Sequence, residues 1–159
     1  MGTINKLTAQ LNVLADGVYG GIHQHDNAVV QAIPTGTTYT KLTLWADNDP
    51  SNHTTPDEAT GTITLDVAGD YKVECQLSIK SGTNNTTVFV SAFLDGVEQQ
   101  QCHFTRKIST AGDVGSGSFT GILTATAGQV LDLRIRHDLG TSVNITNRYG
   151  GLNCQLLAL

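Results

Sequence analysis

Apolar and polar residues alternate without interruption in segment 71–79, YKVECQLSI. Successive side chains of a β-strand point to opposite faces of the sheet, so this segment predicts a strand with one buried face. Similar segments recur at short intervals from residue 28 onward, separated by stretches rich in Gly, Asn, Asp and Ser. The pattern predicts an all-β fold, an antiparallel sandwich or jelly roll of about ten strands.

Turn signals divide the remaining sequence into further expected strands. The Asp95-Gly96 pair predicts a tight hairpin turn, and segment 47–60, DNDPSNHTTPDEAT, predicts a long loop, the kind of segment that often carries binding functions. No helical periodicity interrupts the strand-like segments, which argues against a parallel α/β sheet. The other expected strands are 28–33, 37–47, 62–67, 86–94, 97–108, 118–128, 129–138 and 152–159.

Charge and cysteine content exclude several classes of protein. Charged residues make up 14% of the chain, the net charge is −5, and the largest basic cluster is Arg106-Lys107, so nucleic-acid binding is not expected. No apolar run is long enough to suggest a membrane span or a secretory signal. The three cysteines show no zinc-ligand spacing, which favours a reduced protein made in the cytosol.

The N-terminal segment has a different periodicity from the rest. Apolar residues recur at alternating steps of three and four, as in the seam of a coiled coil. Two heptads are too short to be stable alone, so the segment needs a partner: copies of itself, another protein, or its own domain. We predict particle attachment or trimerisation through Ile4, Leu7, Leu11, Leu14 and Val18.

The order of the strand segments resembles a known superfamily. Three motifs carry the resemblance: Gly69-Asp70-Tyr71 at the start of a central strand, Leu94-Asp95-Gly96-Val97 at a hairpin, and Ala127-Gly128-Gln129-Val130-Leu131 at another strand entry. With the apolar C-terminal strand, they resemble the complement-type globular head and tumour-necrosis-factor-like jelly-roll superfamily over residues 39–159. The resemblance implies a ten-strand jelly roll that assembles as a homotrimer, with residues 1–38 as a separate N-terminal arm or helix.

The sequence departs from the secreted members of this superfamily. It has no collagen-like stalk, and it is rich in Thr, Asn, Gln and Gly. These features resemble the versions found on bacteriophage particles. The resemblance therefore implies a virion-surface protein, a trimeric capsid decoration protein that binds the major capsid protein. Two alternatives stay open: a fibre tip that recognises a bacterial surface glycan or protein, and, less favoured, a secreted signalling ligand.

Catalytic motifs are not found in the sequence. It contains no Gly-x-Ser-x-Gly, phosphate-binding loop or His-Glu-x-x-His, so we expect no enzyme activity and no cofactor. Segment 47–58 has enough oxygen ligands to suggest calcium but lacks the pattern of a calcium-binding loop, and Asx/Pro clusters are mostly turns. Its candidate binding residues are Asp47, Asn48, Asp49, Asn52, His53 and Asp57.

Histidines and aromatic residues are the remaining candidates for metal binding or for contacts between subunits. His23 and His25 would share one face of a strand, where three copies could supply six ligands to a transition metal. A trimer or particle contact and a plain exposed strand are the alternatives. We expect His103 and His137 to face solvent or to form hydrogen bonds within the subunit interface, and not to bind a ligand. The aromatics Tyr39, Trp45, Phe89 and Phe93 belong either to the core or to a subunit contact.

Overall fold

The computed structural model describes residues 6, 8–9, 11–13 and 16–159. The described residues up to Val13, and Asp16, are helical, and β-strands follow from Tyr19. The strands are β1 (Tyr19–Gln24), β2 (Gln31–Ile33), β3 (Thr40–Lys41), β4 (Asp47–Asn48), β5 (Thr54–Asp57), β6 (Thr62–Leu65), β7 (Gly69–Ser81), β8 (Thr86–Leu94), β9 (Val97–Ile108), β10 (Val114–Ala125), β11 (Gln129–His137) and β12 (Val143–Ala158).

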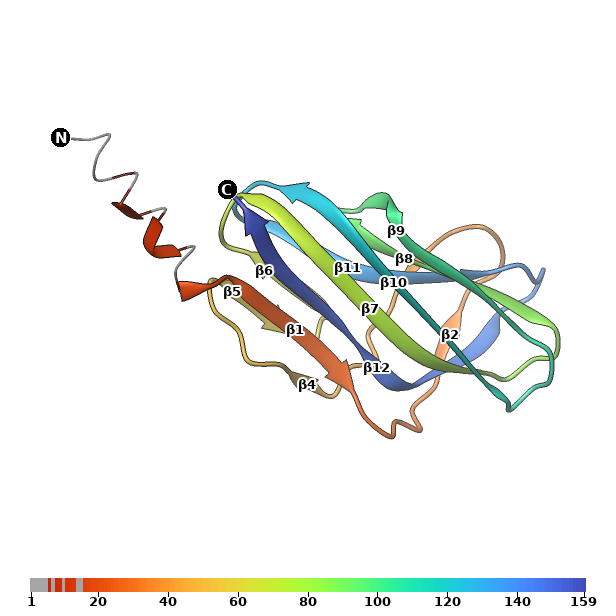
Figure 1. Ribbon diagram of the computed structural model, residues 1–159. Helices are drawn as coiled ribbons and strands as arrows, with labels where there is room; N and C mark the ends of the chain where they lie inside the picture. The colour runs from red at the N-terminus through yellow and green to blue at the C-terminus, as the bar shows by residue number, and fades with distance from the viewer. Residues whose placement is uncertain (1–5, 7, 10, 14–15) are drawn as a thin grey trace.

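The strands form two antiparallel sheets packed face to face (Figure 1). Sheet A has the order β10-β7-β12-β1-β4, with β2 also paired to β12. Sheet B has the order β5-β6-β11-β8-β9, with β3 also paired to β11. This is the predicted jelly-roll sandwich, and the alternation that predicted β7 is confirmed, because all five apolar residues of segment 71–79 are buried.

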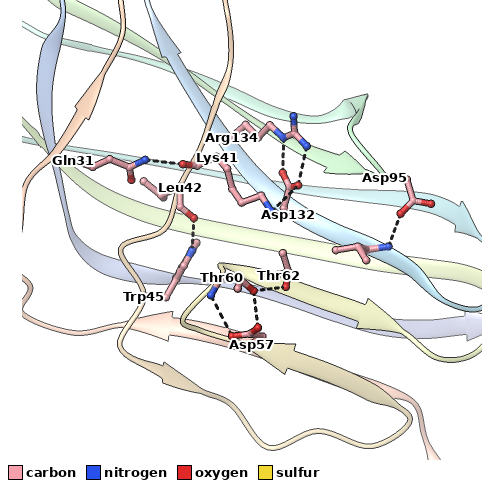
Figure 2. Close-up of polar contacts among 11 residues, drawn as sticks. Gln31, Lys41, Leu42, Trp45, Asp57, Thr60, Thr62, Asp95, Asp132 and Arg134 are labelled. Carbon is pink, nitrogen blue, oxygen red and sulfur yellow. Dashed lines mark hydrogen bonds and ion pairs between the residues drawn. The ribbon is translucent and has the colours of Figure 1, made fainter.

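The hairpin between β8 and β9 also follows the prediction, including the bounds of both strands. Asp95 and Gly96 have φ values of 47° and 81°, the pair of positive angles that a tight hairpin turn requires. The Asp95 carboxylate accepts a hydrogen bond from the backbone N–H of Val130 at 2.9 Å (Figure 2). Through this bond the turn is tied to the first residues of β11.

The first strand lies in a segment that we expected to be outside the sandwich. β1 pairs with β12 over six residues and with β4 over two, and Ile22 is fully buried. Val18 is also buried, so the sandwich begins near residue 18 and not at residue 39. Gly20-Gly21 resembles a flexible linker in sequence, but a Cβ on Gly20 would lie 2.1 Å from the Thr54 hydroxyl oxygen. The glycines therefore allow close packing.

Segment 37–47 is not the regular strand that its alternation predicted. The strand ends at Lys41, after which Leu42 and Trp45 are both buried although they were expected on opposite faces. The Trp45 indole N–H donates to the Leu42 carbonyl at 2.8 Å (Figure 2). The backbone turns because this bond, together with burial of both side chains, offsets the lost strand pairing.

Two expected loops contain strands. Segment 47–60 includes β4 and β5, and Pro56 is tolerated because β5 lies at the edge of sheet B. β12 begins at Val143, although residues 139–151 were expected to form a loop. Gly150 lies within that strand at a φ of 147°, and a Cβ there would stand 2.1 Å from the Gln76 carbonyl oxygen. It marks a close approach of two strands.

The described helical residues before β1 and the C-terminus lie at one end of the sandwich (Figure 1). The connections 82–85, 109–113 and 138–142 lie at the opposite end, and we call them the distal loops. Hydrogen bonds join the first two: Ala111 N–H donates to the Asn84 side chain at 2.7 Å, and Asn85 N–H donates to the Ser109 carbonyl at 3.0 Å. The protein therefore has a basal end and a distal end.

Candidate functional site

The outer face of sheet A is covered mainly by uncharged polar side chains. It carries three shallow hollows of about 480, 320 and 270 Å³. Hydroxyl and amide groups line much of them, including Ser78, Ser116, Ser118, Gln76 and Asn153. Such side chains can form hydrogen bonds with a partner without the desolvation cost of buried charges.

Exposed apolar side chains are concentrated on the same sheet. Tyr19 on β1, Val114 and Ile122 on β10, and Tyr149 and Leu157 on β12 are between 41% and 57% exposed. Sheet B carries one comparably exposed large apolar side chain among the described residues, Val97, at the β8–β9 turn. Because more large apolar side chains are exposed on sheet A than on sheet B, sheet A is the better candidate for contact with another chain.

The two histidines in the first strand region have separate surroundings. The Nδ1 atom of His23 lies 2.8 Å from an Asp49 carboxylate oxygen, and Nε2 lies 4.0 Å from Asp47. The His25 ring stands edge-on to the Tyr149 ring, with 5.3 Å between centroids. They do not form a paired site within one chain.

Asp26, which follows His25, anchors the loop after β1. Its carboxylate accepts hydrogen bonds from Arg148 at 2.6 Å and from the Tyr149 hydroxyl at 3.1 Å. The loop then presents Val29 and Val30 to solvent, at 61% and 52% exposure. The sequence could not indicate this contact, because Asp26 and Arg148 are 122 residues apart.

The candidate residues of segment 47–58 divide into two groups. Asp47 and Asp49 face His23, as described above. The others stabilise the segment itself: the Asn48 side chain accepts from Glu58 N–H at 2.9 Å, Asn52 donates to the Gly17 carbonyl at 2.7 Å, and Asp57 accepts from the Thr60 hydroxyl at 2.7 Å (Figure 2). His53 is exposed and has a positive φ of 52°.

The structure describes only part of the N-terminal apolar seam. Ile4, Leu7 and Leu14 lie outside the described residues. Leu11 is 67% exposed, whereas Val18 is buried in the core of its own sandwich. A hollow of about 230 Å³ at the basal end is lined by Ala9, Val13, Val67, Ala68 and Leu159. Attachment through this segment stays a prediction.

The outer face of sheet B carries an arginine–aromatic cluster that the sequence did not suggest. The Arg136 guanidinium lies 3.8 Å from the centroid of the Phe89 ring and 5.2 Å from that of Tyr39, and Arg134 lies 4.4 Å from that of Phe93. Phe89 and Phe93 are therefore neither in the main core nor free on the surface. Burial and a hydrogen bond with Glu98 raise the pKa of Tyr39.

Asp132 secures this cluster from within sheet B. It is 3% exposed and receives two hydrogen bonds from Arg134, at 2.7 and 2.9 Å, while Lys41 lies 3.8 Å away (Figure 2). Hydrogen bonding to Asp132 raises the pKa of Arg134. The available signal in the sequence was the alternation of Asp132, Arg134 and Arg136, which places three charged side chains on one face of a strand.

The other two candidate histidines differ in burial. His137 is 1% exposed; its Nε2 lies 3.2 Å from the Ile33 carbonyl oxygen and its Nδ1 accepts from Leu139 N–H. His103 is exposed, and its Nδ1 contacts the Gln100 carbonyl. His137 thus holds β2 and β11 together within one chain, where we had expected a solvent-facing or interface histidine.

Within the described part of the chain, no group of three or more His, Cys, Asp or Glu side chains is placed to hold a metal ion. Among those residues, too, no helix has the length and apolar character needed to cross a membrane.

Comparison with protein-family models gave no match, and neither did comparison with curated protein sequences. Solved structures do match the fold. The Eiger TNF of S. frugiperda is 14% identical with a TM-score of 0.56, and the match covers 89% of this chain and 94% of that one. The globular domain of the zebrafish complement 1qA protein is 12% identical with a TM-score of 0.54, covering 88% of this chain and 97% of the other.

The fold of this chain is therefore the jelly roll shared by tumour-necrosis-factor-like and complement globular-head proteins. This agrees with the superfamily that the sequence motifs resemble. The fold is compatible with a structural or binding module.

Proposed function

We propose that the protein is a non-enzymatic bacteriophage virion protein, a homotrimer that decorates the assembled capsid. The distal loops would face outward, and residues 1–18 would attach the protein to the capsid. The proposed contacts are sheet A with other copies and residues 1–18 with the major capsid protein. The protein would be made in the host cytoplasm and displayed on the virion surface.

The observation that carries the self-association step is the unequal distribution of exposed apolar side chains. Five of them lie on sheet A, whereas sheet B carries one comparably exposed large apolar side chain among the described residues, Val97. A threefold oligomer matches a local threefold site of an icosahedral shell. Because such a trimer binds only the assembled shell, it would stabilise that shell by mass action.

Sedimentation of paired variants tests the self-association step. Ile122→Glu places a charge on sheet A, and Val97→Glu places one at the β8–β9 turn, on side chains of similar exposure, 57% and 65%. We expect the first to dissociate the trimer and the second to leave it intact. A monomeric wild-type protein at micromolar concentration would contradict the proposal.

Addition of the purified protein to undecorated shells tests the capsid step. We expect co-sedimentation and greater resistance of the shells to heat or chelator. If the protein neither co-sediments nor protects the shells, the decoration function is wrong.

A second candidate function is a fibre tip that binds a bacterial surface glycan or protein. It is favoured by the distal loops, two of which are joined by hydrogen bonds, and which lie at the end of the sandwich opposite the C-terminus (Figure 1). In this case the isolated protein should bind intact host cells through segments 81–87 and 110–117, with segment 47–60 contributing from the side. Binding to cells but not to shells would favour this function over decoration.

A further inference from the structure

The surroundings of His23 are those of a metal-binding imidazole. Its Nδ1 lies 2.8 Å from Asp49, whose carboxylate can only accept when ionised, so the Nδ1 proton is donated to it. In the neutral imidazole, the form that binds metals, this leaves a lone pair on Nε2. Metal-ligating histidines usually donate their other N–H to a carboxylate or carbonyl in this way, which sets the tautomer and orients the ring.

A second ligand faces the Nε2 atom. Asp47 lies directly across from His23 in the pairing of β1 with β4, and its Oδ2 is 4.0 Å from Nε2. The Asp47 side chain is 76% exposed, so it can rotate without losing packing. A tetrahedral ion bound to imidazole and carboxylate at about 2.0–2.2 Å from each holds the two ligand atoms about 3.3–3.6 Å apart, so the Asp47 carboxylate would move slightly toward Nε2 on binding.

The strand on the other side of His23 from Asp47 does not crowd the ring. His23 pairs with Gly151 of β12, which contributes no side chain to that part of sheet A. The His23 side chain is 40% exposed. Zinc accepts both imidazole and carboxylate ligands, and imidazole also suits nickel.

We propose that His23 and Asp47 are one chain's ligands in a divalent transition-metal site, with Asp49 as a positioning residue, and that other copies complete the coordination. Two protein ligands cannot close a four-coordinate site, and no third group in the described chain is placed to help. The inference rests on the proposed trimer, because β1 and β4 belong to the sheet that carries the self-association face.

Equilibrium dialysis of the untagged full chain against Ni²⁺ tests this site. We expect fewer than one ion per chain, in a fixed ratio to the oligomer. His23→Gln and Asp47→Asn should abolish the binding, and Asp49→Asn should weaken it by about 10- to 100-fold. His25→Gln is the matched control, since His25 contacts Tyr149 instead, and it should bind as the wild type does.

Sedimentation of the same samples separates the two proposals. A trimer that binds no Ni²⁺, or whose binding survives His23→Gln, overturns the metal site and leaves the proposed assembly standing. One ion per chain in a monomer overturns both the shared site and the trimer. Unchanged melting temperatures of the variants show that lost binding is not lost folding.

Discussion

At the scale of single residues, the candidate site residues found in the sequence differ in the side chains that surround them in the folded protein. His23 and His25 differ by two positions, yet one contacts Asp49 and the other Tyr149. His137 looked like a surface residue near a strand end but lies in the interior. Side-chain type was visible in the sequence, whereas the environment of each side chain depended on segments far away in the chain.

The three cysteines should be unreactive in the native protein. All are buried, and burial raises the pKa of the Cys75 and Cys102 thiols and raises that of Cys154 to about 12. Since the thiolate is the reactive form, we expect no reaction with Ellman's reagent at pH 8 until the protein unfolds. Denatured protein should then release three equivalents; rapid labelling of any thiol in the native state would contradict the burial.

Asp57 should contribute to stability at neutral pH but not in acid. Hydrogen bonds from the Thr60 hydroxyl and N–H lower its pKa below the ordinary value of 3.8. A lowered pKa in the folded state stabilises the protein above pH 3.8, and this contribution is lost as the pH falls through the folded-state pKa. Asp57→Asn should therefore lower the urea midpoint at pH 7.

The difference between wild type and Asp57→Asn should shrink as the pH is lowered past that range. The exposed Asp113 provides a control, because Asp113→Asn should show a much smaller effect at either pH. A difference between the two Asp57 proteins that stays constant from neutral to acidic pH would rule out ionisation as its cause.

At the scale of elements, strands with strict alternation and clear turns were the most predictable. β8 and β9 have the expected bounds because alternation and an Asp-Gly turn act within about twenty residues. β1, β4 and β5 were missed, since their stability comes from pairing with β12, β1 and β6. The amino-acid composition of those segments is typical of loops.

The two long outer strands, β9 of sheet B and β10 of sheet A, lie edge to edge. The Gln101 side chain on β9 donates to the Ile122 carbonyl on β10 at 3.2 Å. A Cβ on Gly121 would lie 2.4 Å from the Cys102 sulfur. Because β9 and β10 approach this closely, neither 12-residue strand presents an open edge for aggregation along this side.

Close approach of β12 and β7 makes Gly150 a sensitive position. Gly150→Ala places a Cβ 2.1 Å from the Gln76 carbonyl and 2.9 Å from the Leu77 Cα, both backbone atoms, at a φ of 147°. We expect a loss of about 3 kcal/mol in the free energy of unfolding, measured by denaturant titration.

Gly140→Ala in a distal loop is the matched control. No described atom lies within 4 Å of the position its Cβ would take. Its effect should be within about 0.5 kcal/mol. Equal destabilisation by the two substitutions would show that the strand approach is not the cause.

At the scale of the whole molecule, the position of the N-terminal segment at the basal end suggests a separable attachment device (Figure 1). Deleting residues 1–11 removes Leu11 but leaves Val18 and the buried core. We expect the truncated chain to keep the melting temperature of the full chain within about 4 °C and to lose binding to shells. Shell binding by the truncated chain would place attachment elsewhere.

The sequence by itself determined the fold class, most long strands and the turn between β8 and β9, because these depend on side-chain periodicity and on turn residues close together in the chain. Only the tertiary structure decided that β1 belongs to sheet A, that Asp49 orients His23, and that arginines cover Phe89 and Phe93. The physical reason is that these contacts join residues 26 or more positions apart in the chain, so their energies exist only once distant strands have paired within each sheet.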